Sequence, residues 1–207
     1  MPKIIKNVLQ WDSHLLEGAK FGDLGCGTGT LLMTLAERYP LSKFFGFDIS
    51  REMLSLFHQK LKQSSQKNVS IHNKLPEDGS FDFLSSIDVI HDLAHPSQVL
   101  ASVRKTLKPG GKFLSMDPAT YGTLRENIQK FGKDSCLLKY SISQHYCLQS
   151  STSKRNGSGL GNAGLDDKVV QKLCEEAGFA KVEKLQVGVT EVCFRVWTNK
   201  ENIPSKL

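Results

Sequence analysis

The chain has 207 residues, of which 39% are hydrophobic and 23% are charged. This balance is that of a globular domain that buries a core without disulfides or metals. No apolar run reaches the roughly 18 residues of a membrane helix, and the first ten residues are too polar for a signal peptide. We therefore expect one soluble, cytoplasmic domain over residues 1–198 with no membrane partner, and a tail at 199–207.

Charge and cysteine content narrow the class of partner. The formal charge is +6, but the basic residues are scattered along the chain, which indicates a solvated surface. We therefore do not expect a nucleic-acid partner. The five cysteines are odd in number and contain no C-x-x-C pair. This pattern argues against a disulfide framework and against a metal site, and it predicts a reducing compartment.

Strand and helix patterns alternate along the chain. Helices are predicted at about 3–16, at 30–40, after an N-cap at Ser50, at 96–107, and at 167–177 between Asp166 and Gly178. Strands are predicted at 19–25, 43–50, 68–73, 81–87, 112–118, 181–187 and 190–197. Such alternation predicts an α/β fold, doubly wound around a mostly parallel sheet with helices on both faces. In the last strand, alternating Val192, Phe194 and Val196 predict either a one-sided strand or a strand near the sheet edge.

The stretch FGDLGCGTGTLL, residues 21–32, places Gly25, Gly27 and Gly29 between a predicted strand and a predicted helix. Such a loop exposes free N–H groups of the first helical turn, and glycine lets a ligand approach the backbone. The spacing is neither the G-x-G-x-x-G of dinucleotide sites nor the G-K-[ST] ending of a phosphate loop. We therefore expect a ligand that brings no phosphate to this loop.

Two aspartates suggest the rest of that ligand. Asp48 follows the second predicted strand, where a carboxylate can accept hydrogen bonds from both hydroxyls of a ribose; the alternative is an aspartate that only caps the next helix. Asp23, at the end of the first strand, is an acceptor suited to a cationic amine. An amino acid joined to a nucleoside carries all of these groups, and S-adenosylmethionine is such a molecule.

At these residues the sequence resembles the class I S-adenosylmethionine-dependent methyltransferases. DLGCGTG is similar to the family's first motif, FFGFDIS to its second-strand motif and LKPGGKFLSMDP to its fifth-strand motif, within a resemblance that covers about residues 15–197. DVIHDLAHP, YSISQHYCL and GLG resemble a small-molecule subgroup with a Methyltransferase-25-like domain. Its members often carry a winged-helix segment in front, and we expect this chain to lack that segment.

The resemblance implies a Rossmann-like sheet of seven strands with the last strand antiparallel, and S-adenosylmethionine as cofactor. The cofactor-binding residues that it implies are Asp23, Gly25, Cys26, Gly27, Gly29, Asp48 and Ile49. It also implies that a segment at about 119–165 covers the substrate, where Tyr140, His145 and Tyr146 are candidate substrate contacts or ordinary packing residues.

One segment departs from the family pattern. The family usually places an acidic residue after strand three to accept from the adenine amino group, but SIHNKLPEDGSFD is several residues short. His72 or Asn73 would have to substitute for it. Either the loop is simply trimmed, or cofactor affinity falls, because a lost buried hydrogen bond costs about 1 kcal/mol.

His91 is the candidate catalytic residue, since methyl transfer needs a base only when the acceptor carries a proton. A packing role for His91 is the alternative. SSID after strand four differs from the N/D-P-P-Y/F of nucleic-acid amino-methylating enzymes, and no cysteine lies between 27 and 135 to serve base-C5 chemistry. The leading hypothesis is methyl transfer to a small molecule. The alternatives are a non-catalytic cofactor-binding protein and a protein or RNA methyltransferase, with acceptor and oligomeric state left open.

Overall fold

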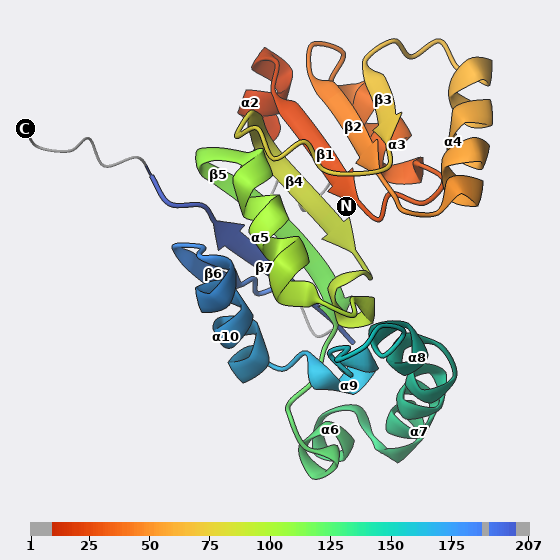
Figure 1. Cartoon of the computed structure of the whole chain (residues 1–207), viewed down its shortest axis with the longest axis vertical. Coiled ribbons are helices and arrows are strands. Elements are labelled where there is room, and N and C mark those ends of the chain that lie inside the picture. The colour runs from red at the N-terminus through yellow and green to blue at the C-terminus, as the bar shows by residue number, and fades with distance from the viewer. Residues whose placement is uncertain (1–9, 188–190, 202–207) are drawn as a thin grey trace, which may run out of the picture.

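The structure is a computed structural model that describes residues 10–187 and 191–201. Within that part of the chain, one sheet of seven strands has the order β3-β2-β1-β4-β5-β7-β6 (Figure 1). The strands are β1 (Lys20–Leu24), β2 (Lys43–Phe47), β3 (Val69–His72), β4 (Phe81–Ile87), β5 (Leu107–Pro118), β6 (Lys181–Lys184) and β7 (Val192–Thr198). β7 pairs antiparallel with both β5 and β6, and every other pair is parallel, so the predicted sheet is confirmed.

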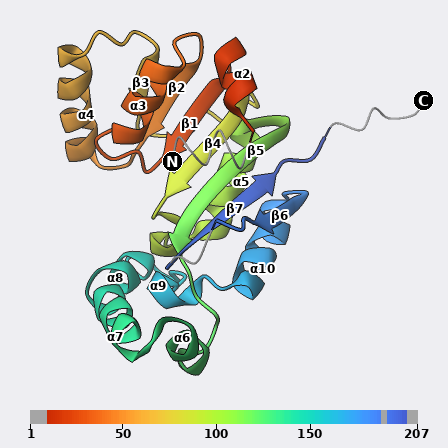
Figure 2. The same ribbon diagram turned by 180° about the vertical axis from the view of Figure 1, so that it is seen from behind.

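Helices cover both faces of this sheet, as predicted (Figures 1 and 2). They are α2 (Asp12–Glu17), α3 (Thr30–Arg38), α4 (Arg51–Gln63), α5 (Pro96–Thr106), α6 (Leu124–Phe131), α7 (Lys133–Ile142), α8 (Leu148–Ser151), α9 (Gly161–Gly164) and α10 (Asp167–Ala177). Leu15, Leu35 and Phe57 anchor α2, α3 and α4 in one hydrophobic core. Leu100 and Leu173 anchor α5 and α10 in a second core on the opposite face. Of the helix predicted at about 3–16, residues 1–9 lie outside the described chain.

The predicted helix ends are confirmed by side-chain caps. Ser50 Oγ accepts a hydrogen bond from the backbone N–H of Met53 at the start of α4. Asp166 Oδ1 accepts from the backbone N–H groups of Lys168 and Val169 at the start of α10, and Gly178 ends that helix in the left-handed conformation. These caps satisfy donors and acceptors that a helix end leaves unpaired, so local sequence sets where the helices begin and end.

The last strand lies near the edge of the sheet, beside the edge strand β6, which is one of the two predicted alternatives; the other alternative, a one-sided strand, is wrong. β7 lies between β5 and β6, and Arg195 and Trp197 on its other face are buried as well. Both of these side chains have polar partners: Arg195 Nη2 lies 2.9 Å from Asp167 Oδ1, and Trp197 Nε1 donates to Ser115 Oγ. Because paired polar groups can be buried at low cost, the alternation of apolar residues did not mark an exposed face.

Two features of the connections position the site. The strand order reverses between β1 and β4, and in such sheets ligands bind beyond the carboxyl ends of the strands at this point. After β5, helices α6 to α9 gather beyond these carboxyl ends (Figure 1). Among the described residues, none of the helices is both long and apolar enough to cross a membrane.

Candidate active site

The glycine loop joins β1 to α3. Gly25, Gly27 and Gly29 all have positive φ, at 70°, 53° and 75°. Gly29 is the N-cap of α3, and a Cβ built there would overlap the ring of Phe57. A Cβ built at Gly27 meets no atom within 4 Å. Gly29 is therefore required by packing and by φ, whereas Gly27 borders open space in which a ligand can approach the backbone.

A cavity of about 620 Å³ lies beside this loop, at the reversal of strand order. Residues that line it include Gly25, Asp48, Ile49, Asn73, Leu75 and Val99. The size suits a small ligand. Ile49 is 93% exposed, which is unusual for so apolar a side chain and leaves it available to a flat ring.

The short connection between β3 and β4 contributes one wall of the cavity. Asn73 lines the cavity, whereas His72 does not and instead stacks near Phe45 and Phe47. Of the two residues expected to replace the family's adenine acceptor, only Asn73 is therefore placed to do so. No helix forms over residues 73–80.

Asp48 connects the loop to the next helix. Its Oδ2 accepts the backbone N–H of Gly27 at 2.9 Å, and its Oδ1 accepts the backbone N–H of Ser50 at 2.9 Å. The bond to Ser50 orients the N-cap residue of α4, whereas the capping bond itself is made by Ser50. An ionised carboxylate has about four lone-pair sites, so Asp48 retains acceptor capacity toward the cavity that it lines, and its ribose role stays a prediction.

Asp23 is buried beneath the loop, and Ser85 Oγ donates to its Oδ1 at 2.6 Å. Burial, opposed by the Ser85 hydrogen bond and reinforced by the charge of Asp48, raises the pKa of Asp23 to about 7. The ionised form of this carboxylate is therefore destabilised by its surroundings. A cationic group placed beside it would relieve that penalty.

Cys26, predicted as a cofactor contact, has its thiol in the core. A Cβ at Gly46 would lie 2.8 Å from Cys26 Sγ, which shows that the thiol packs against β2. Burial, with the charges of Asp23 and Asp48 adding to it, raises the pKa of Cys26 to about 12. Cys26 can therefore contact a ligand in the loop through its backbone but not through its side chain.

His91 lies in the 3₁₀ turn η1 (Ile90–Asp92) after β4 and is 1% exposed. Its Nδ1 lies 3.0 Å from Asp117 Oδ1, and its Nε2 lies 3.2 Å from Asp92 Oδ1 and 3.7 Å from Asp88 Oδ1. Burial opposes protonation, but the hydrogen bond and charge of Asp117, with Asp92 and Asp88, raise the pKa of His91. Its base role stays a prediction.

Sequence reasoning missed Asp117. This residue ends β5 beside β4, is fully buried, and accepts hydrogen bonds from both the ring and the backbone N–H of His91. The available signal was its place in KFLSMDP, because the carboxyl ends of neighbouring parallel strands meet at one edge of the sheet. Asp88 is strained, with φ of 62°, at the matching end of β4.

The predicted substrate contacts do not converge. Tyr140 Oη accepts from Asn127 Nδ2 at 3.1 Å. His145 is exposed, and its Nδ1 lies 2.8 Å from the carbonyl oxygen of Ser141 in the same helical segment. Tyr146 is 72% exposed. None of the three lines the cavity, so their substrate roles stay predictions.

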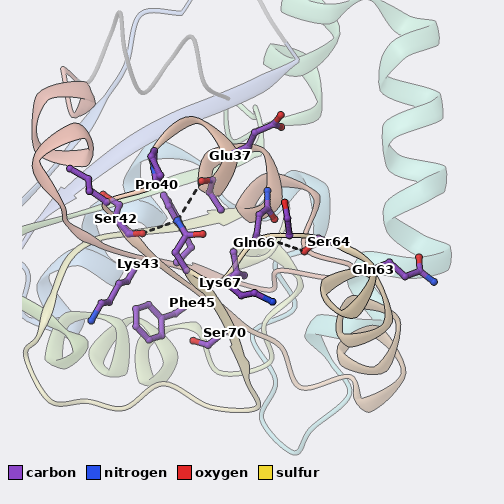
Figure 3. A pocket seen from close by; sticks show the side chains of 16 residues that line it. Glu37, Pro40, Ser42, Lys43, Phe45, Gln63, Ser64, Gln66, Lys67 and Ser70 are labelled. Carbon is purple, nitrogen blue, oxygen red and sulfur yellow. Dashed lines mark hydrogen bonds between the residues drawn. The ribbon is translucent and has the colours of Figure 1, made fainter.

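A larger hollow of about 980 Å³ lies at the opposite edge of the sheet (Figure 3). Residues around Pro40, Lys43 and Lys67 line it, at the amino ends of β2 and β3. Parallel sheets bind ligands at the carboxyl ends of their strands, where the glycine loop lies. The hollow lies at the amino ends of the strands, so a ligand of the glycine loop would not occupy it.

The chain resembles known proteins over most of its length. A family model described as a methyltransferase domain matches residues 15–178. An uncharacterized 37.1 kDa protein in transposon TN4556 of Streptomyces fradiae is 37% identical over 100 residues, which cover 46% of this chain and 29% of that protein. The demethylmenaquinone methyltransferase of Lactococcus lactis subsp. lactis (strain IL1403) is 28% identical over 184 residues, covering 81% of this chain and 68% of the relative.

Among solved structures, a SAM dependent methyltransferase from Aquifex aeolicus has a TM-score of 0.60 and 20% sequence identity, covering 96% of this chain and 93% of its own. This likeness shows a shared fold. Together with the family match over residues 15–178, it shows that the chain belongs to the methyltransferase-domain family of class I S-adenosylmethionine-dependent enzymes.

Proposed function

We propose that this protein transfers the methyl group of S-adenosylmethionine to a small-molecule acceptor in a reducing compartment such as the cytoplasm. The observation that carries the proposal is the open space at Gly27, next to Asp48 and the 620 Å³ cavity at the reversal of strand order. The small-molecule acceptor is favoured by the Lactococcus lactis relative, whose name specifies demethylmenaquinone.

We assign the roles of the site residues as follows. The glycine loop and Asp48 hold the cofactor, and Asp23 balances its ammonium group. The sulfonium of the cofactor is already a good leaving group, so the protein must mainly align the acceptor with the methyl carbon. Where the acceptor is a hydroxyl or an amine, His91 held by Asp117 takes its proton.

The test is titration calorimetry with S-adenosylmethionine, followed by a screen of phenolic, quinol and amine acceptors for transfer of a labelled methyl group. Saturable binding and transfer to one acceptor class are expected. Absence of cofactor binding would remove the proposal altogether.

A non-catalytic cofactor-binding protein is the second candidate. It is favoured by the short 73–80 connection, which offers the neutral amide of Asn73 where the family usually has an acidic acceptor. Cofactor binding without transfer to any acceptor, protein and RNA substrates included, would support this candidate.

Asp48→Asn is expected to weaken cofactor binding about tenfold, since a hydrogen bond to a charged acceptor contributes roughly 1.5 kcal/mol or more. The matched control is Asp78→Asn, because Asp78 Oδ1 accepts the N–H of Ser80 as Asp48 Oδ1 accepts that of Ser50, outside the cavity. Calorimetry on both variants checks this. Equal effects would refute the ribose assignment.

Cofactor affinity is expected to fall about tenfold or more as the pH is lowered from 7.5 to 5.5, because Asp23, with a pKa near 7, becomes neutral and no longer attracts the ammonium. Asp23→Asn should bind weakly and lose this pH dependence. A pH series of calorimetric titrations measures the effect, and an unchanged slope in the variant would contradict the pairing.

The same pKa predicts the stability of Asp23→Asn. The folded protein holds the Asp23 proton up to about pH 7, above the range of an unfolded aspartate, so the wild type loses stability as the pH rises through this range. At pH 8 the variant should be more stable by on the order of 1–3 kcal/mol in urea unfolding.

A further inference from the structure

Three ligand-type side chains converge at one end of the candidate active site. His91 and Asp92 come from η1, and Cys147 comes from the last position of the π-helix η2 (Ser143–Cys147), more than fifty residues away in the sequence. One ligand atom from each residue lies within 4.8 Å of the others. We infer that this cluster is a binding site for a divalent transition metal, with zinc as the best match.

The chemistry of the cluster selects the kind of metal. Imidazole, carboxylate and thiolate are the three ligand types of zinc sites, whereas magnesium and calcium take oxygen ligands. A tetrahedral zinc ion holds nitrogen and oxygen ligands at about 2.0 Å, which separates them by about 3.3 Å. His91 Nε2 lies 3.2 Å from Asp92 Oδ1, which fits this separation. Among the described residues the cluster holds three ligand side chains, which leaves the fourth position of a tetrahedral ion to water, as in open zinc sites.

The buried side of the cluster is independently built for a metal-bound histidine. Ligating histidines are held by a carboxylate on the other ring nitrogen, which fixes the tautomer that presents Nε2. Asp117, fully buried at the end of β5, lies 3.0 Å from His91 Nδ1 and supplies this interaction.

Asp92 gives a second indication. Its Oδ1 atom is buried and has no hydrogen-bond partner within the described chain, although it faces His91 Nε2. Burying a carboxylate oxygen costs free energy unless the oxygen is paired, so a cation bound at this oxygen would stabilise it. Without a metal, a protonated His91 offsets part of this charge and the thiol of Cys147 hydrogen-bonds to Asp92, so zinc would replace these two protons.

An ion can reach the cluster from one side. The Asp88 side chain is 65% exposed and that of Asp92 is 37% exposed, whereas that of His91 is 2% exposed. The exposed carboxylates lie at His91 Nε2, whereas Asp117 lies at Nδ1. Since a metal on Nε2 occupies the lone pair that a general base needs, His91 can act as a base only while the cluster holds no metal. The inference does not rest on the proposed function, because metal binding is read without cofactor or acceptor.

The experiment is titration of the full, reduced, metal-free chain with Co²⁺, followed by absorption. We expect saturation at about one ion, visible bands of tetrahedral intensity, a near-ultraviolet thiolate-to-cobalt charge-transfer band, and displacement of all bands by Zn²⁺. Cys147→Ser should lose the charge-transfer band. The matched control is Cys136→Ala, which removes another cysteine of the same segment, outside the cluster, and should keep both signals.

A charge-transfer band that persists in Cys147→Ser, or the absence of any saturable Co²⁺ spectrum in the wild type, would overturn the assignment. Circular dichroism shows whether the variant is folded. If it is not, alkylation of the wild type decides: zinc should protect Cys147 from iodoacetamide, as read by mass spectrometry. Equal labelling of Cys147 with and without zinc would also overturn the site.

Discussion

Replacing Gly27 with valine is expected to abolish cofactor binding in a protein that still folds. A Cβ at this position meets no protein atom within 4 Å, so the added side chain would fill only the space that we assign to the ligand. The positive φ of 53° adds strain of about 1–3 kcal/mol, which a stable domain tolerates. Calorimetry with S-adenosylmethionine should detect no binding, and the thermal transition should stay cooperative.

Gly29→Val is the matched comparison, because it separates loss of the ligand's space from loss of the fold. The loop conformation is the same in kind, but the new side chain would overlap the ring of Phe57, which is fully buried in the core under α4. Overpacking and strain together cost ~4 kcal/mol or more, so we expect this variant to unfold or melt far earlier. Normal cofactor affinity in Gly27→Val would exclude the loop as the binding site.

His91→Ala is expected to lower the rate of methyl transfer about 10²-fold, because help from a general base is confined to the transition state. The neutral imidazole is the base, and its pKa in the folded protein lies above the usual 6.5. The rate should therefore fall as the pH is lowered through that pKa, and this acidic limb should disappear in the variant. Saturated rates across pH, on the acceptor found by screening, provide the measurement.

Asp117→Asn separates a base from a packing histidine. Loss of the Asp117 charge removes the main influence that raises the pKa of His91, so the acidic limb should move to lower pH while His91 remains. If His91 only packs behind β4, His91→Ala would instead lose melting temperature and cofactor affinity together. The rate per folded, cofactor-saturated molecule would then be unchanged, and the base role would be refuted.

The sequence alone determined the layout of the sheet and one half of the site. Alternation of strand and helix, with the caps at Ser50 and Asp166, predicted the seven strands and the helices α3, α4, α5 and α10, because hydrophobic periodicity and capping act within a few residues. Helices α6 to α9 were not predicted. The glycine loop and Asp48 were predictable for the same reason: each sits directly after a strand of a parallel sheet, where ligands bind.

Only the tertiary structure decided which distant residues meet. It placed β7 inside the sheet, because the partners that allow Arg195 and Trp197 to be buried lie in other segments. It likewise put Asp117 behind His91 and Cys147 beside it, a thiol whose sequence spacing had argued against a metal site. Local pattern reports which face of an element is apolar, whereas the neighbours of a polar side chain depend on packing between segments far apart in the chain, and no short-range pattern encodes that packing.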